Sequence, residues 1–342
     1  MKLSDIKLTP LIETLRFEDI SDEEYFSKKY SNYISNSRLS LINPNQNGNP
    51  DKFFNGKFNN YSDSLLFGSF LHQLVLQPES FFLCTTVDRP TGKTGYIADE
   101  VYNKSGKVPT NEQLLEASKK YDYYKSNITD KKLEDLKFRC YNYWRNRSLF
   151  EHDYKDDKYI LYSDPKNRER ITECITSLNK DKNIQDLLHP SGLITDPTIG
   201  FEKTILLDIL IEIPNEEPFI LKFKSKLDHY SIDLESNTIT VNDLKTTGRN
   251  VDEFNDALMN YHYYREMAVY SWLLSLCANK FFYLNNPTIT SNFLVVSTIP
   301  AYRTRVVPMN KKLFMLGFNE FKKLFKLVAY YVSIKYKDFA KY

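Results

Sequence analysis

Hydrophobic and polar side chains alternate along residues 219–248, and this alternation predicts two β-strands joined by a hairpin. Phe223, Ser225 and Leu227 occupy every second position of the first strand. Because successive side chains of a strand point to opposite faces, the residues between them share the other face. That second face carries Lys222, Lys224, Lys226 and Asp228.

The second strand of this hairpin ends in Asp243-Leu244-Lys245. Its alternation places Asp243 and Lys245 on one face and turns Leu244 toward the hydrophobic layer behind. If the two strands are neighbours, Asp228 converges on the same place. Two carboxylates suit a hard cation such as Mg²⁺, and a lysine beside it can orient water or neutralise charge on a phosphate. The simpler alternative is an ordinary hairpin with a surface ion pair.

The periodicity of the remaining chain indicates an α/β protein. Residues 200–213 read as a strand in which Glu202, Asp208 and Glu212 have the same parity, and residues 291–309 read as two more strands. Residues 1–30 predict a short helix or an extended arm, and residues 87–101 a loop. Helical patterns cover residues 35–42, 61–83, parts of 102–164, 164–188, 251–276 and 311–336.

Composition narrows the class of protein. Of 342 residues, 42% are hydrophobic, which is enough for a substantial core, and the net charge is only +2, so a nucleic acid would have to be held by local basic patches. The four cysteines form no C-x-x-C pair, which argues against a zinc site. With no signal-peptide run and no 18-residue apolar stretch, we expect a cytoplasmic protein without membrane association.

The pattern Lys224-x-Lys226-x-Asp228, followed by a hydrophobic strand and Asp243-Leu-Lys-Thr-Thr, resembles the core of the PD-(D/E)xK nuclease superfamily. Phage-type exonucleases of the exodeoxyribonuclease VIII kind are the most similar. The resemblance implies a restriction-endonuclease-like α/β core, with a mixed central β-sheet flanked by helices and a helical N-terminal portion. It further implies an arm at 1–30 and a single nuclease domain at 31–342, with a helical insertion at about 102–164.

The same resemblance implies a metal site. His72, in a G-x-x-x-H arrangement on a predicted helix, matches a metal-binding histidine, although a lone histidine there is more often structural. Glu202 best matches a metal-binding glutamate, with Asp208 or Glu212 as alternatives. The implied ligands of Mg²⁺, for which Mn²⁺ would substitute, are His72, Glu202, Asp228, Asp243 and the Leu244 carbonyl. The implied catalytic residues are Lys245, Asp243, Asp228, Glu202 and Tyr270.

The family places a Q-x-x-x-Y motif in the helix predicted at 251–276, facing the DNA end. This chain has Tyr270 in the tyrosine position but Glu266 where glutamine is expected. A glutamate there would repel phosphate unless it binds metal or pairs with Arg265 or Lys245. The residues predicted to contact DNA are Arg89, Lys93, Lys224, Lys226, Arg249, Arg265, Glu266 and Tyr270.

Two other cofactors are not expected. Gly92-Lys93-Thr94 resembles the end of a phosphate-binding P-loop, but that motif needs glycine where the chain has Val87, so we expect no nucleotide cofactor. Some nucleases of the superfamily carry an iron–sulfur cluster on a C-terminal cysteine group, and no cysteine follows Cys277.

The function that the resemblance implies is metal-dependent hydrolysis of DNA by an exonuclease that degrades double-stranded ends from 5′ to 3′. It also implies a phage enzyme in the host cytoplasm, a ring-shaped homo-oligomer and a single-strand annealing partner in recombination. Two alternatives stay open. One is a nuclease of the same superfamily that acts on single-stranded or branched DNA, and the other is a DNA-end-binding protein that has lost catalysis.

Overall fold

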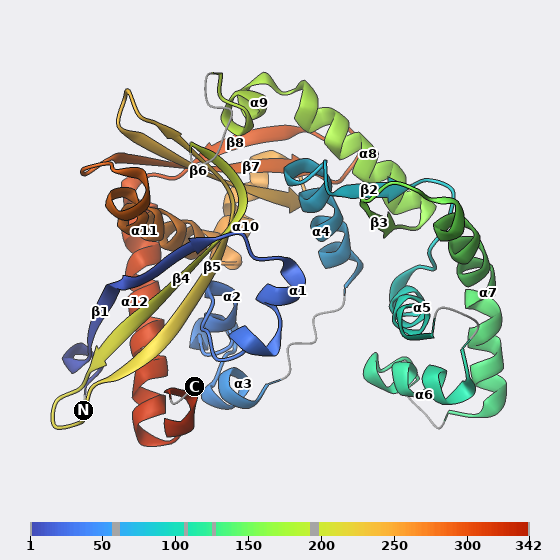
Figure 1. Cartoon of the computed structure of the whole chain (residues 1–342), viewed down its shortest axis with the longest axis horizontal. Coiled ribbons are helices and arrows are strands. Elements are labelled where there is room, and N and C mark those ends of the chain that lie inside the picture. Colours follow the sequence, from blue (N-terminus) through green and yellow to red (C-terminus); the bar gives the residue numbers. More distant parts are fainter. Residues whose placement is uncertain (1, 57–61, 106–108, 125–127, 192–197, 341–342) are drawn as a thin grey trace. The chain divides into compact units, whose positions relative to one another are not determined.

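A computed structural model describes residues 2–56, 62–105, 109–124, 128–191 and 198–340 (Figure 1). The chain divides into two compact units. The first consists of residues 1–58 and 178–342, and the second of residues 59–177. Each unit has its own hydrophobic core. This division differs from the predicted one, because residues 1–30 belong to the first unit and the second unit begins well before residue 102.

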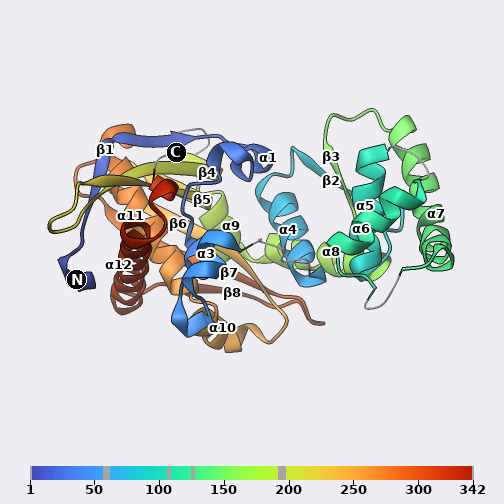
Figure 2. The same ribbon diagram turned by 90° about the horizontal axis from the view of Figure 1, so that it is seen from below.

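The first unit is built on a six-stranded mixed sheet with the strand order β1-β4-β5-β6-β7-β8 (Figure 1, Figure 2). Strands β6 and β7 run parallel, and the other described neighbours are antiparallel. The α/β class and the hairpin predicted at 219–248 are therefore confirmed. The strands are β1 (Lys7–Glu18), β4 (Ile199–Glu212), β5 (Phe219–Asp233), β6 (Thr238–Thr247), β7 (Thr288–Ser297) and β8 (Thr304–Pro308).

Two long helices cover the hydrophobic side of this sheet. Helix α11 (Tyr263–Phe282) connects the parallel strands β6 and β7, and α12 (Lys311–Ile334) packs beside it. Phe223 of β5 contacts the rings of Phe321 and Phe325 on α12, so the apolar face of the predicted hairpin forms the core. The smaller helices of the unit are α1 (Asp22–Tyr25), α2 (Asn36–Leu39), α3 (Pro50–Asn55), α9 (Lys182–Leu188) and α10 (Phe254–Asn260), with 3-10 turns η1 (Leu3–Asp5), η2 (Lys28–Tyr30), η3 (Pro44–Gln46), η4 (Val251–Glu253) and η5 (Lys337–Ala340).

The N-terminal residues are part of the sheet, which corrects the expectation of a separate arm. Strand β1 pairs with β4 along one edge, and Pro10 is tolerated there because proline, which lacks an N–H donor, is accepted on edge strands. The segment after β1 returns across the sheet as α1, whose first turn is capped by the Ser21 side chain. Two acidic residues of this segment, Asp19 and Asp22, then contact lysines of β4 and β5.

The second unit is mostly helical. Its helices are α4 (Asp63–Leu76), α5 (Gly92–Ser105), α6 (Asn111–Lys120), α7 (Asp130–Asp153) and α8 (Pro165–Lys180), which runs into the first unit, and its parallel strands are β2 (Phe81–Cys84) and β3 (Tyr159–Tyr162). The prediction of a loop over residues 87–101 is wrong from Gly92 on. Helix α5 begins at Gly92 and buries Ile97 and Val101 against Trp144 and its neighbours.

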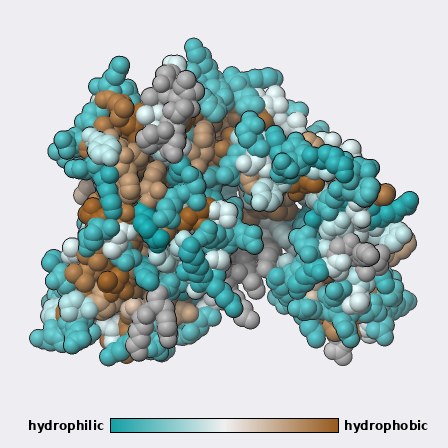
Figure 3. All heavy atoms as spheres, viewed as in Figure 1, coloured by the Kyte–Doolittle hydropathy of each residue, from teal (hydrophilic) through white to brown (hydrophobic). Residues whose placement is uncertain are grey.

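Two predicted helices are each broken into a pair. Asp181 separates α8 from α9, because its side chain accepts the N–H groups of Asn183 and Ile184 and so caps a new helix. His262 separates α10 from α11 with a left-handed backbone, at φ 56°. Among the described helices, none is both long and apolar enough to cross a membrane. Most of the surface visible in Figure 3 is hydrophilic, with hydrophobic residues in small patches.

Candidate functional site

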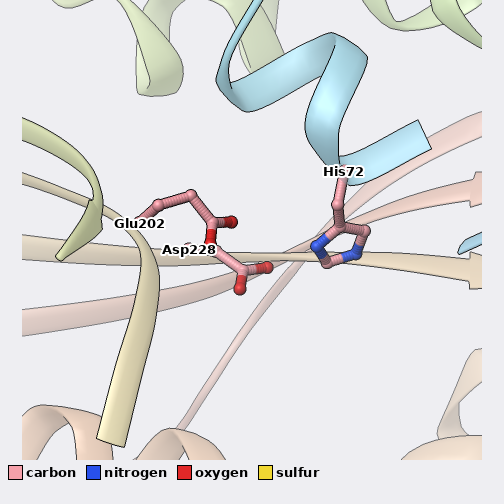
Figure 4. Close-up of side chains that lie close together, drawn as sticks. All are labelled: His72, Glu202 and Asp228. Carbon is pink, nitrogen blue, oxygen red and sulfur yellow. The ribbon is translucent and has the colours of Figure 1, made fainter. Parts of the chain in front are cut away.

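Strands β4 and β5 place two of the predicted ligands opposite each other. Their register pairs Phe201 with His229 and Lys203 with Leu227. Glu202 and Asp228, which lie between these pairs, therefore face each other across the two strands and point to the same side of the sheet. One carboxylate oxygen of Glu202 lies within 4.8 Å of one of Asp228 (Figure 4).

The other two acidic residues of β4 lie elsewhere. Asp208 pairs with Lys222, six residues beyond Glu202, which corresponds to roughly 20 Å along a strand. Glu212 forms an ion pair with Lys7 at 2.7 Å. Of the three acidic residues that parity left as alternatives, the structure places Glu202 beside Asp228.

The backbone of Glu202 is strained. It has φ 53°, in the left-handed region, although it lies within a strand, and the regular pairing of β4 with β5 is interrupted there. A non-glycine residue in this conformation costs on the order of 1–3 kcal/mol, and such residues gather at functional sites. The strain therefore suggests that this carboxylate is held in place for a function.

Asp243 and Lys245 join Asp228 where β5 and β6 separate. The pairing of these strands ends at His229 and Asn242, and Asp228 Oδ2 then accepts the N–H of Leu244 at 2.8 Å. Lys245 Nζ lies 3.1 Å from Asp243 Oδ1 and 2.8 Å from Asp243 Oδ2. Leu244 is buried on the opposite face. The structure thus brings together Asp228, Asp243 and Lys245, which sequence alternation placed on one face.

Helix α11 adds a second carboxylate partner for Lys245. Glu266 Oε2 lies 2.9 Å from Lys245 Nζ, and Glu266 Oε1 accepts the Tyr270 hydroxyl at 3.3 Å. Glu266 and Tyr270 are one helical turn apart and share a face of α11. Glu266, which stands where the sequence resemblance expects glutamine, is therefore paired with Lys245, one of the two pairings expected from the sequence.

The carboxylates at this site stabilise one another's protonated forms. Burial raises the pKa of Asp228 to about 7, with further contributions from the negative charges of Glu202 and Glu266, while Lys245 opposes the shift. The pKa of Asp243 is also raised, first by burial and then by Asp228 and Glu266, again against the effect of Lys245. This cluster of like charges would be stabilised by an additional cation.

The charge of Lys245 is supported from two sides. Burial alone would lower its pKa, but Asp243 and Glu266 outweigh that effect and raise the pKa well above the usual range. Conversely, Lys245 and the Tyr270 hydroxyl overcome the burial of Glu266 and lower the pKa of that carboxyl. Lys245 is therefore present as an ammonium ion in this arrangement.

A second lysine stands next to Glu202. Lys226 Nζ lies 3.2 Å from Glu202 Oε2 and also contacts Asp22 of α1. Burial raises the pKa of Glu202, and Lys226 counteracts this rise. The contribution of Asp22 could not be found by periodicity, because it lies about two hundred residues before Lys226 in the chain.

His72 lies on α4 and is half-buried. It belongs to the second unit, whereas Glu202, Asp228, Asp243 and Lys245 belong to the first. Its role as a metal ligand therefore stays a prediction from the sequence.

Three residues predicted to contact DNA are buried and are bonded to other groups of the protein. Their predicted role is therefore corrected. Arg89 forms an ion pair with Asp99 at 2.7 Å, and Lys224 donates to the Tyr25 carbonyl. Arg265 is 1% exposed and binds Glu320 at 3.1 Å. Surface phosphate contacts need accessible cations, so we assign structural roles to all three.

The other predicted contacts differ in their exposure. Lys93 and Arg249 are exposed, whereas Lys226, Glu266 and Tyr270 are engaged in the contacts described above. Lys93 donates to the Asp122 carbonyl at 2.9 Å. Exposed cations can reach a phosphate, so Lys93 and Arg249 keep their predicted role.

Neither a protein-family model nor a curated protein matches this chain. Among solved structures, a crystal structure of a protein from Eubacterium rectale described as a "Putative exonuclease" is similar at 11% sequence identity. Its TM-score is 0.46, and the similarity covers 91% of this chain and 86% of that chain. A likeness of this size shows neither the family nor the activity of the present protein.

Proposed function

We propose that the protein is a metal-dependent deoxyribonuclease with a PD-(D/E)xK core. The observation that carries this proposal is the convergence of Glu202, Asp228, Asp243 and Lys245 on one side of three neighbouring strands. Hydrolysis of a phosphodiester requires a cation that holds the phosphate and a group that positions the attacking water. The cluster offers residues for both tasks.

The residues present fit a hard divalent cation. Glu202, Asp228 and Asp243 supply oxygen donors, which are the ligands that a hard cation prefers, and Asp243 Oδ2 is buried in an ion pair with Lys245 at 2.8 Å. With the Leu244 carbonyl and His72 as further ligands, this set would hold Mg²⁺, with Mn²⁺ as a substitute. When bound, such a cation would polarise the phosphate and favour ionisation of a water molecule.

Lys245 would position the attacking water and stabilise the negative charge that develops on the phosphate. Asp243 and Glu266 hold its ammonium group from two sides. An ammonium in that place can donate to the attacking water or to a non-bridging phosphate oxygen, where negative charge develops in the transition state. Glu266 in turn keeps Lys245 oriented, and Tyr270 fixes Glu266 through its hydroxyl.

We further propose the finer activity that the sequence resemblance implies. The substrate would be the end of double-stranded DNA, degraded from 5′ to 3′ by a phage enzyme in the host cytoplasm. The protein would act as a ring-shaped homo-oligomer and pass the remaining strand to an annealing protein for recombination. The sequence motifs quoted above support this part of the proposal.

A digestion assay tests the activity. Linear duplex DNA labelled at either the 5′ or the 3′ end, with a covalently closed circle as control, is incubated with Mg²⁺, Mn²⁺ or EDTA. We expect loss of the linear DNA with either metal, no loss with EDTA, and no cleavage by Asp243→Ala. Asp208→Asn is the matched control, because it removes a carboxylate of the same sheet about 20 Å from Glu202.

The alternatives give different results in the same assay. Cleavage of single-stranded or branched DNA in preference to duplex ends would favour another nuclease of the superfamily. Tight binding of DNA ends with no cleavage under any metal would favour a binding protein. Undiminished cleavage by Asp243→Ala would refute the assigned site.

A further inference from the structure

Lys226 connects the candidate metal site to the N-terminal segment. Its Nζ contacts Glu202 on β4 at 3.2 Å and Asp22 on α1, and its side chain is only 15% exposed. Glu202 faces the other ligands, whereas Asp22 lies on the surface and is about half exposed. One ammonium group therefore has two carboxylate partners in very different surroundings.

The segment that carries Asp22 is fixed to the sheet by other contacts. Asp19 forms an ion pair with Lys203 of β4 at 2.7 Å, and the Tyr25 carbonyl accepts the ammonium group of Lys224 on β5. Asp22 is thus held beside Lys226 independently of the ion pair between them. Asp22 can therefore still bind Lys226 when Glu202 no longer does.

Glu202 needs a positive charge nearby. It is mostly buried, and Asp22 and Asp243 add negative potential to the desolvation that it already bears. In this arrangement the positive charge comes from Lys226. A divalent cation bound by Glu202 and Asp228 would replace this charge, and it would also repel an ammonium group that remained in contact with Glu202.

We propose that Lys226 is an internal counter-ion that holds Glu202 until the metal binds and is then retained by Asp22 alone. This inference rests on the proposed metal site and adds to it a residue pair that sets the metal affinity. Lys226 acts through Glu202 and is therefore a positioning residue rather than a ligand.

Two substitutions should change the metal affinity in opposite directions. Lys226→Met removes the charge that competes with the metal for Glu202, so we expect Mn²⁺ to bind more tightly, on the order of tenfold. Asp22→Asn removes one of the two carboxylates that Lys226 contacts and leaves it paired with Glu202. Lys226 then competes more strongly with the metal for Glu202, so we expect Mn²⁺ to bind several-fold more weakly. A merely structural role for Lys226 would not produce opposite signs.

The ion pair between Lys203 and Asp19 provides matched controls. It joins the same N-terminal segment to the neighbouring strand β4, at 2.7 Å. Because the contact of Lys224 with the Tyr25 carbonyl still holds the segment when this ion pair is removed, Lys203→Met and Asp19→Asn should leave the Mn²⁺ affinity within about twofold of the parent protein. If Lys226→Met does not fold, as judged by circular dichroism, the exposed substitution Asp22→Asn still tests the inference.

In the experiment, the full chain is titrated with Mn²⁺. Binding is measured by calorimetry and, independently, by the electron paramagnetic resonance signal of the Mn²⁺ that stays free. Tighter binding by Lys226→Met and weaker binding by Asp22→Asn, with unchanged controls, would support the inference. Metal-dependent cleavage by the parent protein with equal affinities in all variants would overturn the inference and leave the proposed function intact. Absence of Mn²⁺ binding to the parent protein would overturn both.

Discussion

Substitution of Glu320 by glutamine should destabilise the first unit strongly. Arg265, beside Glu266 on α11, is 1% exposed, and its Nη1 donates to Glu320 Oε1 at 3.1 Å. Glu320 also accepts the Tyr264 hydroxyl at 2.7 Å and the side-chain amide of Asn43 at 2.8 Å. This carboxylate joins α11, α12 and the loop after α2, and it balances the charge of a buried guanidinium.

The expected cost follows from that burial. Glu320→Gln keeps the shape of the side chain but leaves Arg265 without its charged partner. Removal of one member of a buried ion pair typically costs about 3–5 kcal/mol, a large share of the roughly 5–15 kcal/mol by which domains are stable. The matched control is Asp252→Asn, whose partners Arg303 and Arg305 are 57% and 41% exposed. An exposed pair of this kind contributes about 0–1 kcal/mol.

The two tryptophans allow the first unit to be followed by itself. Trp144 lies in the core of the second unit, and Trp272 packs on Phe318 and Phe321 in the first. In a Trp144→Phe background, the fluorescence of Trp272 during urea unfolding reports the free energy of unfolding of the first unit. A loss in Glu320→Gln no larger than that in Asp252→Asn would refute the reasoning.

The loss should also depend on pH. Burial tends to raise the pKa of Glu320, but hydrogen bonds from His262 and Tyr264 and the charge of Arg265 outweigh burial and lower it. The stabilisation by ionised Glu320 is therefore fully present above the unfolded pKa of 4.5 and is lost as the pH falls through the lower folded pKa. The difference between Glu320→Gln and the parent should shrink over that acidic range.

Three further predictions concern the lysines and Glu266. Lys245→Met should slow metal-dependent cleavage by about a hundredfold or more while Mn²⁺ binding persists in calorimetry, and unchanged cleavage would contradict its role. Glu266→Gln keeps a hydrogen-bonding group beside Lys245 and introduces the glutamine that the sequence resemblance expects there, so cleavage should be at least as fast as in the parent. A tenfold loss would show that the carboxylate is required. Burial lowers the pKa of Lys224 to about 8, so between pH 8 and 10.5 the unfolded chain binds more protons than the folded one. The free energy of unfolding of the parent should therefore rise over this range relative to that of Lys224→Met, and parallel pH profiles would show that the pKa of Lys224 is not lowered.

Local alternation was sufficient for the centre of the site. A period of two fixes which side chains share a face, and neighbouring strands joined by a tight hairpin must pair, so Asp228, Asp243 and Lys245 were placed together from the sequence. The choice among Glu202, Asp208 and Glu212 needed the register of β4 on β5. Parity alone leaves all three on the same face and says nothing of their position along the strand.

Contacts between distant segments could not be predicted in this way. Strand β1 occupies a sheet edge, where a proline and polar residues weaken the alternation that identifies a strand. Arg265 pairs with Glu320, and Lys226 pairs with Asp22. In each pair the two residues lie on different elements that are far apart in the sequence. Charge pairing across such separations depends on the packing of helices and strands, and a single sequence carries no periodic signal for it.

The most direct test of the proposed metal site is the rate of a single turnover on linear duplex DNA. It is measured over a Mg²⁺ titration for the parent, Glu202→Gln and Asp208→Asn. Glu202 lies beside Asp228 at the proposed metal site, whereas Asp208 pairs with Lys222 on the same strand. We predict that Glu202→Gln loses about a hundredfold or more in rate and needs more Mg²⁺, while Asp208→Asn behaves as the parent. Equal rates for Glu202→Gln and the parent would contradict the account.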